Sequence, residues 1–244
     1  TRSFVKIMNH AKVNFGVLGT EESASGDVAK RAGNEFLFQM QALMNIQLLN
    51  SYNVKRIVTT CPHDYNTIKN EYKGLGGNYE VFHHTEFIFE LIKNKKLNLK
   101  YNSKEITMTY HDPCYLGRGN NIFNKPRELL KQVGFNIFEM PRFKNKSFCC
   151  GAGGAQMFKE PEKGIQDINI NRTEEALKTI GCLDNKNKNF HRESDKQKSR
   201  KVIVTSCPFC NTMMTDGVKY KNKESEVEVL DIVEIITEEI KNNL

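Results

Sequence analysis

The sequence contains one pattern twice, and this duplication restricts the fold more than any other feature. KRIVTTCPHDYNTIKNEY (55–72) resembles KVIVTSCPFCNTMMTDG (201–217), because in each a short β-branched run leads into Cys-Pro and a polar helix start. YEVFHHTEFIFELI (79–92) and VEVLDIVEIITEEI (227–240) form a second pair. Both members of this pair are typical of a short strand that leads into an amphipathic helix.

A third pair precedes these two in the same order. VKIMNHAKVNFGVLG (5–19) resembles RELLKQVGFNIFEMP (127–141), and both predict a helix followed by a strand. Helices that alternate with short apolar strands indicate the α/β class with a mostly parallel sheet. We therefore predict two pseudo-symmetric, Rossmann-like α/β units, at residues 1–100 and 101–244.

The two units differ in two places. The second begins with ITMTYHDPCYLGRG (106–119), a strand that ends in a cysteine loop, whereas the first begins at the following helix. We expect the natural protein to carry an N-terminal strand and loop before Thr1, with a cysteine. The second unit also contains a highly charged stretch at about 184–201, which is typical of a solvated insertion.

Composition limits the function classes. The formal net charge of +7 is spread over many Lys residues without a basic stripe, so nucleic-acid binding is not expected. The sequence shows neither a membrane-spanning apolar stretch nor a signal peptide, which predicts a cytoplasmic location. In such a chain, 7 cysteines indicate metal or redox use rather than a disulfide framework.

Five of the six cysteines in the second unit lie where a predicted strand meets a loop. They are Cys114, the adjacent pair Cys149 and Cys150, and the CxxC pair Cys207 and Cys210. If the strands are parallel neighbours, their carboxyl ends bring these thiols to one edge of the sheet. Gly151, Gly153 and Gly154 would let the backbone turn sharply beside a bulky cofactor, and Pro208 would stiffen the CxxC turn.

Several kinds of site are compatible with these thiols. A thioredoxin-like CxxC pair would leave the other cysteines unused, and tetrahedral zinc needs only four ligands. Soft sulfur ligation by five thiolates favours an iron–sulfur cluster over zinc. Cys182 has no glycine-rich surroundings and is interpreted as a buried structural residue.

The order Cys114, Cys149-Cys150-Gly151 and Cys207-x-x-Cys210 resembles the CCG cysteine-rich domain of heterodisulfide reductase B and D subunits and their relatives. GNEFLFQ (33–39) and CPFCNTMMTDG (207–217) are also similar to bacterial iron–sulfur proteins of this group. The resemblance implies that the five cysteines bind a non-cubane [4Fe-4S] cluster, with zinc as the less favoured metal.

The first unit departs from the family pattern. Where relatives have EE-x-C-x-G-D, this chain reads EESASGD, with Ala24 in the cysteine position. Its CPHD stretch places Asp64 opposite Cys210 of the second unit. We do not expect a full cluster here, although Cys61, His63 and Asp64 are candidates for a minor metal site, and a structural or electrostatic role is favoured for Asp64.

The resemblance implies an iron–sulfur electron-transfer subunit of a heterodisulfide reductase-like oxidoreductase. A flavoprotein or ferredoxin-type redox partner is expected, in a hetero-oligomer that is compatible with peripheral membrane association through its partners. Two alternatives remain open. One is a non-redox scaffold subunit that holds structural zinc, and the other is a direct disulfide reductase.

Overall fold

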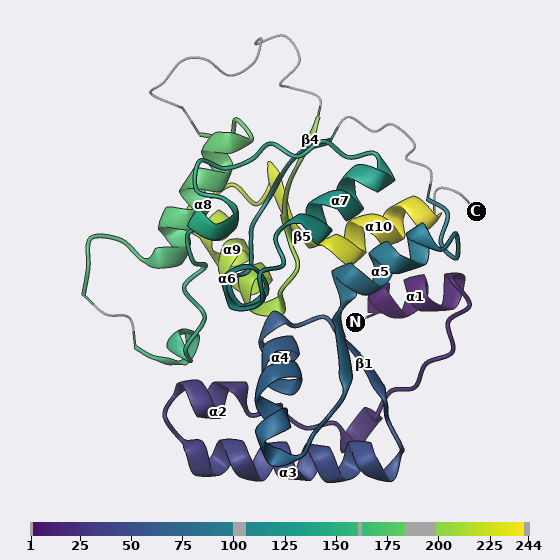
Figure 1. The fold of residues 1–244 in the computed structure, drawn as a ribbon. Helices are drawn as coiled ribbons and strands as arrows, with labels where there is room; N and C mark the ends of the chain where they lie inside the picture. The colour runs from purple at the N-terminus through teal and green to yellow at the C-terminus, as the bar shows by residue number, and fades with distance from the viewer. Residues whose placement is uncertain (1, 100–105, 161–162, 184–198, 242–244) are drawn as a thin grey trace.

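The computed structural model describes residues 2–99, 106–160, 163–183 and 199–241 (Figure 1). The first half contains two strands and several helices. In chain order these are α1 (Arg2–His10), a 3₁₀ turn (Gly19–Glu21), α2 (Asp27–Arg31), α3 (Glu35–Ser51), β1 (Arg56–Thr59), α4 (Pro62–Asn66) with its π-helical (Thr67–Glu71) and 3₁₀ (Tyr72–Leu75) continuations, β2 (Glu80–His83) and α5 (His84–Lys93).

The second half contains three strands. Its elements are β3 (Ile106–Tyr110), α6 (Cys114–Asn120), α7 (Asn124–Val133), two 3₁₀ turns (Lys144–Lys146 and Gln156–Phe158), α8 (Ile168–Thr179), β4 (Arg200–Thr205), α9 (Pro208–Tyr220), β5 (Val227–Asp231) and α10 (Ile232–Lys241). The predicted insertion at 184–201 lies mostly outside the described residues.

Each half forms its own parallel sheet. β1 pairs with β2, and β4 lies between β3 and β5 in a three-stranded sheet. The first two repeats are therefore confirmed as strand–turn–helix units, with β1–α4 equivalent to β4–α9 and β2–α5 equivalent to β5–α10. The predicted α/β class with parallel sheets is also confirmed.

The prediction from the third pair of repeats is only partly confirmed. Its two helices form as α1 and α7, but neither predicted strand forms. The stretch after α7 makes a single bridge, between Ile137 and Met108 of β3, and the stretch after α1 makes none. A strand needs a neighbour with a free edge to pair with. In the first half, the described residues contain no strand equivalent to β3, which is the strand that the stretch after α7 bridges.

One helix of each half packs against a helix of the other half. α1 packs against α10, and the equivalent helix α7 packs against α5, as expected for a pseudo-two-fold arrangement. The Thr237 hydroxyl of α10 also donates a hydrogen bond to the Ser3 carbonyl at 3.1 Å. One hydrophobic core thus draws on both halves, since it includes side chains of α1, α5, β3, α7, β4 and α10. The predicted boundary between residues 100 and 101 falls outside the described residues.

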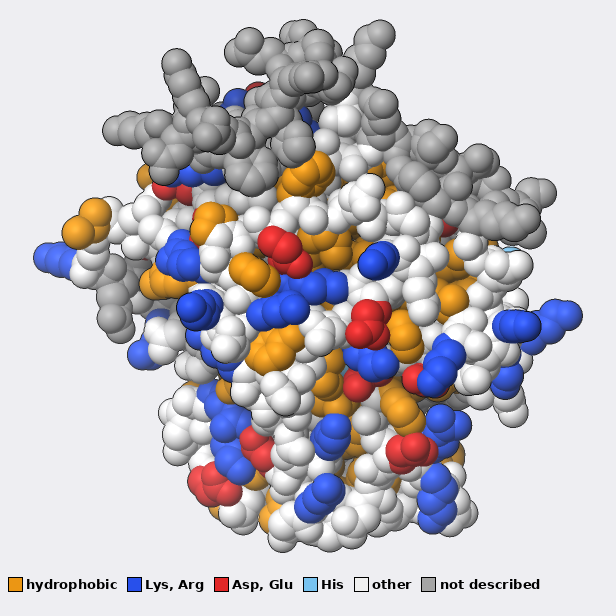
Figure 2. All heavy atoms as spheres, turned by 45° about the horizontal axis from the view of Figure 1, so that its top comes forward, with side chains coloured by type: hydrophobic (Ala, Val, Ile, Leu, Met, Phe, Trp, Pro, Cys, Tyr) orange, Lys and Arg blue, Asp and Glu red, His pale blue; other side chains and the backbone are white. Residues whose placement is uncertain are grey.

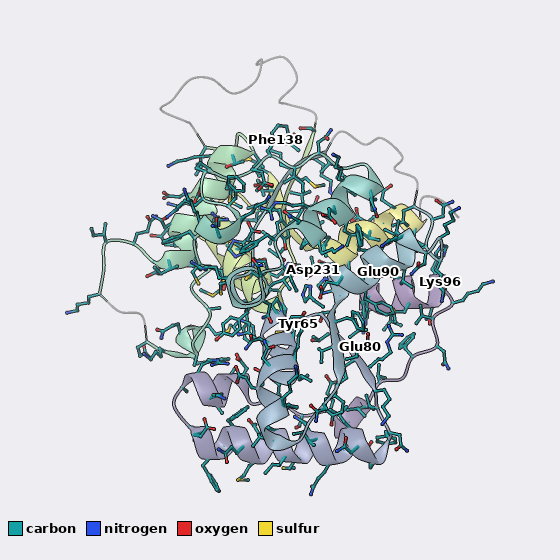
Figure 3. All side chains as sticks on the ribbon, viewed as in Figure 1. Tyr65, Glu80, Glu90, Lys96, Phe138 and Asp231 are labelled. Atoms are coloured by element: carbon teal, nitrogen blue, oxygen red, sulfur yellow. The ribbon has the colours of Figure 1, made fainter. Side chains whose placement is uncertain are left out.

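The carboxyl ends of the two sheets meet. His83, at the end of β2, donates from Nε2 to the Ser206 carbonyl at 3.1 Å, and its ring lies edge-on to Tyr65. His84 approaches Asp231, the last residue of β5, at 3.4 Å. Tyr65 and Asp231 lie at the boundary between the halves in Figure 3. The strand ends of both halves therefore face one shared region. Within the described residues, no helix is long and apolar enough to cross a membrane.

Candidate metal centre

The five predicted cysteines lie at the carboxyl end of the three-stranded sheet. Cys114 is the first residue of α6, after β3. Cys207 caps the N-terminus of α9, after β4, and Cys210 lies in the first turn of that helix. The adjacent pair Cys149 and Cys150 lies in the loop that follows the 3₁₀ turn at 144–146. Cys150, Cys207 and Cys210 are buried, whereas Cys114 and Cys149 are half-buried.

The five thiols form one connected group. Cys149 interacts through its side chain with Cys114 and with Cys150. Cys150 in turn interacts with Cys210, and Cys210 interacts with Cys207. Three segments that are far apart in the sequence thus place their sulfur atoms close together. The structure brings together all five residues that the sequence analysis selected.

The first half also contributes to this group. The side chains of Cys61 and His63 both contact Cys207 across the boundary between the halves. The sequence predicts these two residues as candidates for a separate minor metal site together with Asp64. Asp64 lies beside Cys61, and its carboxylate also accepts a hydrogen bond from the Ser25 hydroxyl at 2.6 Å. Cys61 and His63 are therefore neighbours of the second-half thiols.

His111 is a member of the site that the sequence analysis did not select. Its ring nitrogen and the sulfur atoms of Cys150 and Cys210 lie within 4.8 Å of one another, a spacing that could hold a metal ion. The Arg172 guanidinium, which is fully buried, donates from Nε to His111 Nδ1 at 3.0 Å. Because Nδ1 accepts this bond, the neutral imidazole carries its proton on Nε2.

Sequence signals for these two residues existed. His111 directly follows the strand that leads to Cys114, in the stretch HDPC. Arg172 lies four residues before Ala176, on the buried face of α8, so a charged residue interrupts an apolar face. A buried guanidinium needs polar partners, and Arg172 Nη2 has none among the described residues. Arg172 is therefore held beside the thiol group with part of its hydrogen-bonding capacity unused.

A buried ion pair holds the loop that carries His111 and Cys114. Arg127 of α7 binds both carboxylate oxygens of Asp112, at 2.6 and 2.8 Å. Asp112 also accepts a bond from the Lys144 backbone N–H at 2.8 Å, and Arg127 binds Glu139 with its remaining donors. Bidentate pairing of this kind fixes geometry more tightly than a single contact. The loop is therefore held both by Arg127 of α7 and by the backbone at Lys144.

Two of the thiols, Cys149 and Cys207, have a lowered pKa. Bonds from the Cys114 and Cys150 thiols, with a further bond from the Gly151 N–H at 3.3 Å, hold the pKa of Cys149 well below its usual range. Burial opposes ionisation of Cys207, but bonds from Cys210, Cys61 and His63 outweigh it and lower the pKa of Cys207. Cys207 also lies at the N-terminus of α9, where the helix dipole favours a thiolate.

The loop after Cys150 approaches the first half closely. Gly151 and Gly154 adopt positive φ angles of 92° and 69°, which favour glycine. At Gly153, an added Cβ would lie 3.8 Å from both His63 and the ring of Tyr115. The predicted role of Gly151 and Gly154 in turning the backbone is thus observed, and Gly153 packs beside the residues that join the two halves.

His63 is held by the first half and stacked by the second. Its Nδ1 lies 2.8 Å from Asp27, and its ring stacks on Tyr115 with a centroid distance of 4.1 Å. Burial opposes protonation of His63, but the bonds to Asp27 and Cys207 outweigh it and raise its pKa to about 9. Asp27 is itself bound by Arg31 at 3.1 Å. The sequence analysis did not select Asp27, although it ends the EESASGD stretch.

Cys182 lies apart from this group. It is buried in a separate hydrophobic cluster with Leu177, Ile203 and Val218. Burial raises its pKa, and its polar neighbour is Lys201. Figure 2 shows Lys and Arg side chains dispersed among Asp and Glu on the viewed face, so the net charge of +7 is spread there rather than gathered.

Comparisons with known proteins agree with the duplicated architecture. The family model described as the CCG cysteine-rich domain matches residues 1–69 and 108–215, one range in each half. The chain is 44% identical over 239 residues to the probable iron-sulfur-binding oxidoreductase FadF of Bacillus subtilis, which covers 98% of this chain and 31% of that protein.

Two further relatives cover nearly the whole chain. It is 40% identical over 240 residues to the EtfAB:quinone oxidoreductase of Syntrophomonas wolfei, across 96% of this chain and 31% of that protein. It is 28% identical over 240 residues to the D subunit of the dihydromethanophenazine:CoB–CoM heterodisulfide reductase of Methanosarcina barkeri, across 96% of this chain and 53% of that protein. The chain thus spans about a third to a half of the length of these relatives. No solved structure matches the chain.

Proposed function

This chain belongs to the CCG cysteine-rich domain family, and on that premise we propose that it is an iron–sulfur electron-transfer component of a heterodisulfide reductase-like oxidoreductase. The observation that carries the proposal is the single group, buried at three of its members, that five thiols from three distant segments form. Five sulfur donors exceed the four that tetrahedral zinc takes, and thiolates suit iron–sulfur clusters. The donor set therefore fits this cofactor.

In this proposal five cysteines hold a [4Fe-4S] cluster of the non-cubane type. They are Cys114, Cys149, Cys150, Cys207 and Cys210. When bound, such a cluster supplies one-electron transfer, and the protein tunes its potential through burial, charge and hydrogen bonds to sulfur. The contact of Cys149 with Cys150 supports a role for this adjacent pair in binding neighbouring irons.

The surrounding residues have distinct parts in this proposal. His111 lies beside the sulfur atoms of Cys150 and Cys210, and the Arg172 guanidinium positions its ring from behind. Asp112 and Arg127 position the loop that carries Cys114. His63 and Cys61 close the group from the first half and are not counted as ligands. We keep Asp64 as a structural residue, because Ser25 binds its carboxylate.

The names of two relatives indicate the kind of redox partner. One relative is named as an oxidoreductase that connects EtfAB to quinone, and another as part of a heterodisulfide reductase. We propose that this chain exchanges electrons with a flavoprotein or ferredoxin-type partner in a hetero-oligomer. A cytoplasmic location, with peripheral membrane association through partners, remains a prediction. Direct reduction of a disulfide at the centre is a secondary proposal, motivated by the same heterodisulfide reductase relative.

The decisive experiment is metal analysis of the protein purified without oxygen. We expect about four irons and a similar amount of sulfide per chain, a broad visible absorption, and an EPR signal in one oxidation state. Stoichiometric zinc with no visible absorption would reject the iron–sulfur proposal and favour the non-redox scaffold. Anaerobic assays with small disulfides, with electron supply by a reduced dye, would separate a reductase from an electron relay.

A further inference from the structure

β1 and β4 are equivalent strands, but the described part of the chain gives β1 only one of the two neighbours that β4 has. β4 lies between β3 and β5, whereas β1 pairs with β2 alone. On the β3 side, the carbonyl of Val204 accepts a hydrogen bond from the His111 N–H at 2.9 Å. Val58 is the equivalent of Val204 in the repeat. Its backbone therefore faces an edge where no described strand lies.

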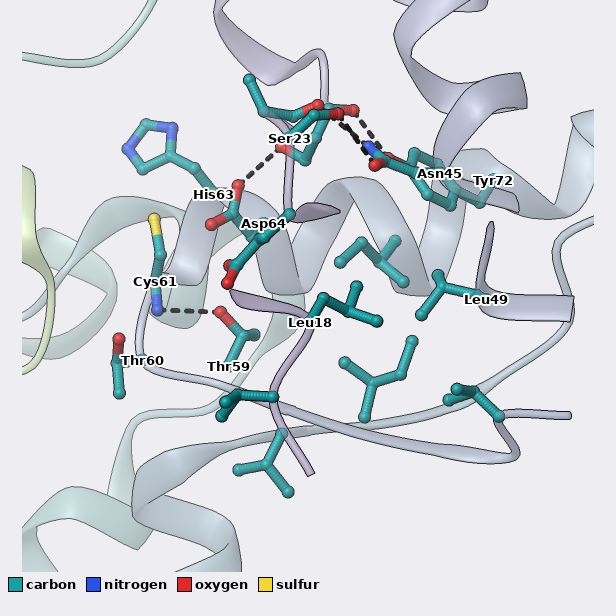
Figure 4. Close-up of a pocket in the computed structure, with 18 of the residues that line it drawn as sticks. Leu18, Ser23, Asn45, Leu49, Thr59, Thr60, Cys61, His63, Asp64 and Tyr72 are labelled. Atoms are coloured by element: carbon teal, nitrogen blue, oxygen red, sulfur yellow. Dashed lines mark hydrogen bonds between the residues drawn. The ribbon is translucent and has the colours of Figure 1, made fainter. Parts of the chain in front are cut away.

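A large cavity opens at this edge of β1 (Figure 4). Its volume is about 1640 Å³, and its wall includes all four residues of β1 but none of β2. Leu18 and Leu49 lie along it, and Cys61, His63 and Asp64 form one end (Figure 4). Small-molecule pockets usually measure roughly 300–1,000 Å³. The size and the position along a strand favour a segment of polypeptide as the occupant.

The surroundings of the cavity are apolar and incompletely covered. Five large hydrophobic side chains line it and are nevertheless exposed: Phe15, Val17, Val28, Leu37 and Tyr52. Val17 is 73% exposed. A contiguous exposed apolar patch of this kind marks an interaction site. An occupant with apolar side chains would cover these exposed residues.

Burial of the equivalent strands points to the same conclusion. Ile203 and Val204 of β4 are fully buried. Their equivalents in β1, Ile57 and Val58, are only half-buried although they are the same residue types. Central parallel strands are buried on both faces and rich in β-branched residues. β1 therefore has the sequence of a central strand in the position of an edge strand.

We propose that the free edge of β1 binds a parallel, apolar β-strand from the part of the same polypeptide that precedes Thr1. This strand completes the first sheet in the way that β3 completes the second. Backbone hydrogen bonds along β1 supply the pairing, as in other cases of strand addition. The proposal does not depend on the metal or on the proposed function.

The occupant is assigned from the repeat. α1 is the equivalent of α7, and α7 follows β3 by way of α6. The start of α1 lies near α5, because the rings of Phe4 and His84 are 6.1 Å apart, and Phe4 and Val5 line the same cavity as β1. The relatives FadF and EtfAB:quinone oxidoreductase contain about two thirds of their length outside the match, so long segments accompany this domain there. β3 carries His111 and Cys114 to the thiol group, and the added strand would likewise bring its end to Cys61.

Hydrogen exchange tests the proposal. The 244-residue chain is compared with a longer polypeptide from the same gene that includes the residues before Thr1, both purified anaerobically with their metal. We expect the Val58 amide to exchange at least about 100-fold more slowly in the longer polypeptide. The Val204 amide serves as the internal control and should exchange equally in both. Fast exchange of Val58 in both proteins would overturn the proposal.

A backbone variant sharpens this test. Val58→Pro removes the N–H that faces the free edge, so in the longer polypeptide it should abolish the added protection, measured at the Arg56 amide. Val58→Ala keeps the N–H and should retain the protection. Concentration-dependent protection of the 244-residue chain, together with dimer formation, would assign the edge to a second copy and reject the proposed occupant. A start codon directly before Thr1 would reject it as well.

Discussion

The two halves contain the same strand, Cys-Pro turn and helix, and they use them differently. In the second half the turn leads to Cys210, which is buried and joins the thiol group. In the first half the equivalent residue is Asp64, whose carboxylate is bound by Ser25. The local sequence pattern therefore determines the strand–turn–helix backbone in both halves. The identity of one residue decides whether the turn can contribute sulfur to a site.

The halves also differ in how much apolar surface they cover. α3 in the first half exposes an apolar face that consists of Phe36, Met40, Leu43 and Met44. Its counterpart α8 places a charged residue, Arg172, on its buried face instead. Helix α3 thus leaves an apolar face open, whereas α8 buries a guanidinium. The open face of α3 and the free edge of β1 both lie in the first half.

The largest expected effect comes from changing the two equivalent turn positions. Cys210→Ser should lose or convert the cluster, because a serine oxygen is a much harder donor than a thiolate. Cys150→Ser should behave in the same way. Asp64→Ser, at the equivalent position in the first half, should retain the iron. Iron and sulfide content per chain, measured after anaerobic purification, distinguishes these outcomes.

Cys182→Ser is the matched control for these variants, since Cys182 is buried in a separate cluster. It should leave iron and sulfide unchanged. Loss of iron in Cys182→Ser or in Asp64→Ser, with full iron in Cys210→Ser, would mean that the working site lies elsewhere.

A second effect concerns the ion pairs that hold each half. Arg127→Met leaves the Asp112 carboxylate buried without its bidentate partner and should lower the free energy of unfolding by about 3 kcal/mol. Arg31→Met removes a more exposed partner of Asp27, which keeps its bonds from His63 and Thr67, and should cost about 1 kcal/mol. Anaerobic urea unfolding of both variants, followed by circular dichroism, measures the difference. Equal costs would contradict the tighter locking of the second half.

A third effect compares the equivalent strands. Val204→Ala removes two methyl groups from a fully buried position and should cost about 2.5 kcal/mol of unfolding free energy. Val58→Ala removes the same groups from a half-buried position and should cost about 1 kcal/mol in the 244-residue chain. The same urea experiment measures both. If the two substitutions cost the same, β1 is as well covered as β4 and the comparison fails.

The smallest effect should come from Cys61→Ser. Cys61 contacts Cys207 but belongs to the half without a full ligand set, so iron content should stay unchanged. The EPR line shape should shift slightly, because a hydroxyl replaces a thiol beside a ligand sulfur. Cys207→Ser, at the equivalent position, should instead lose iron. If Cys61→Ser alone abolished the signal, the first half would be the working site.

Much of this architecture was encoded locally. The β-branched runs, the Cys-Pro turns and the amphipathic helices each depend on residues close in sequence, so the sequence predicted both parallel sheets and the strand–helix units. The third repeat was wrong in its strands because pairing depends on how a segment lies against a neighbouring strand, which no local pattern records. The stretch after α1 lines the cavity beside β1 but does not pair with it.

The candidate metal centre was likewise predicted from the sequence in part and completed by tertiary packing. The five cysteines could be selected from sequence, because adjacent and CxxC cysteines after strands are unusual enough to indicate a function. Only the tertiary structure joined Cys61 and His63 to Cys207, which lies over 140 residues away, and only it placed Arg172 against His111. These contacts form because the carboxyl ends of two sheets meet and α8 packs beside them. The sequence alone determined which residues could bind metal, and packing decided which of them lie together.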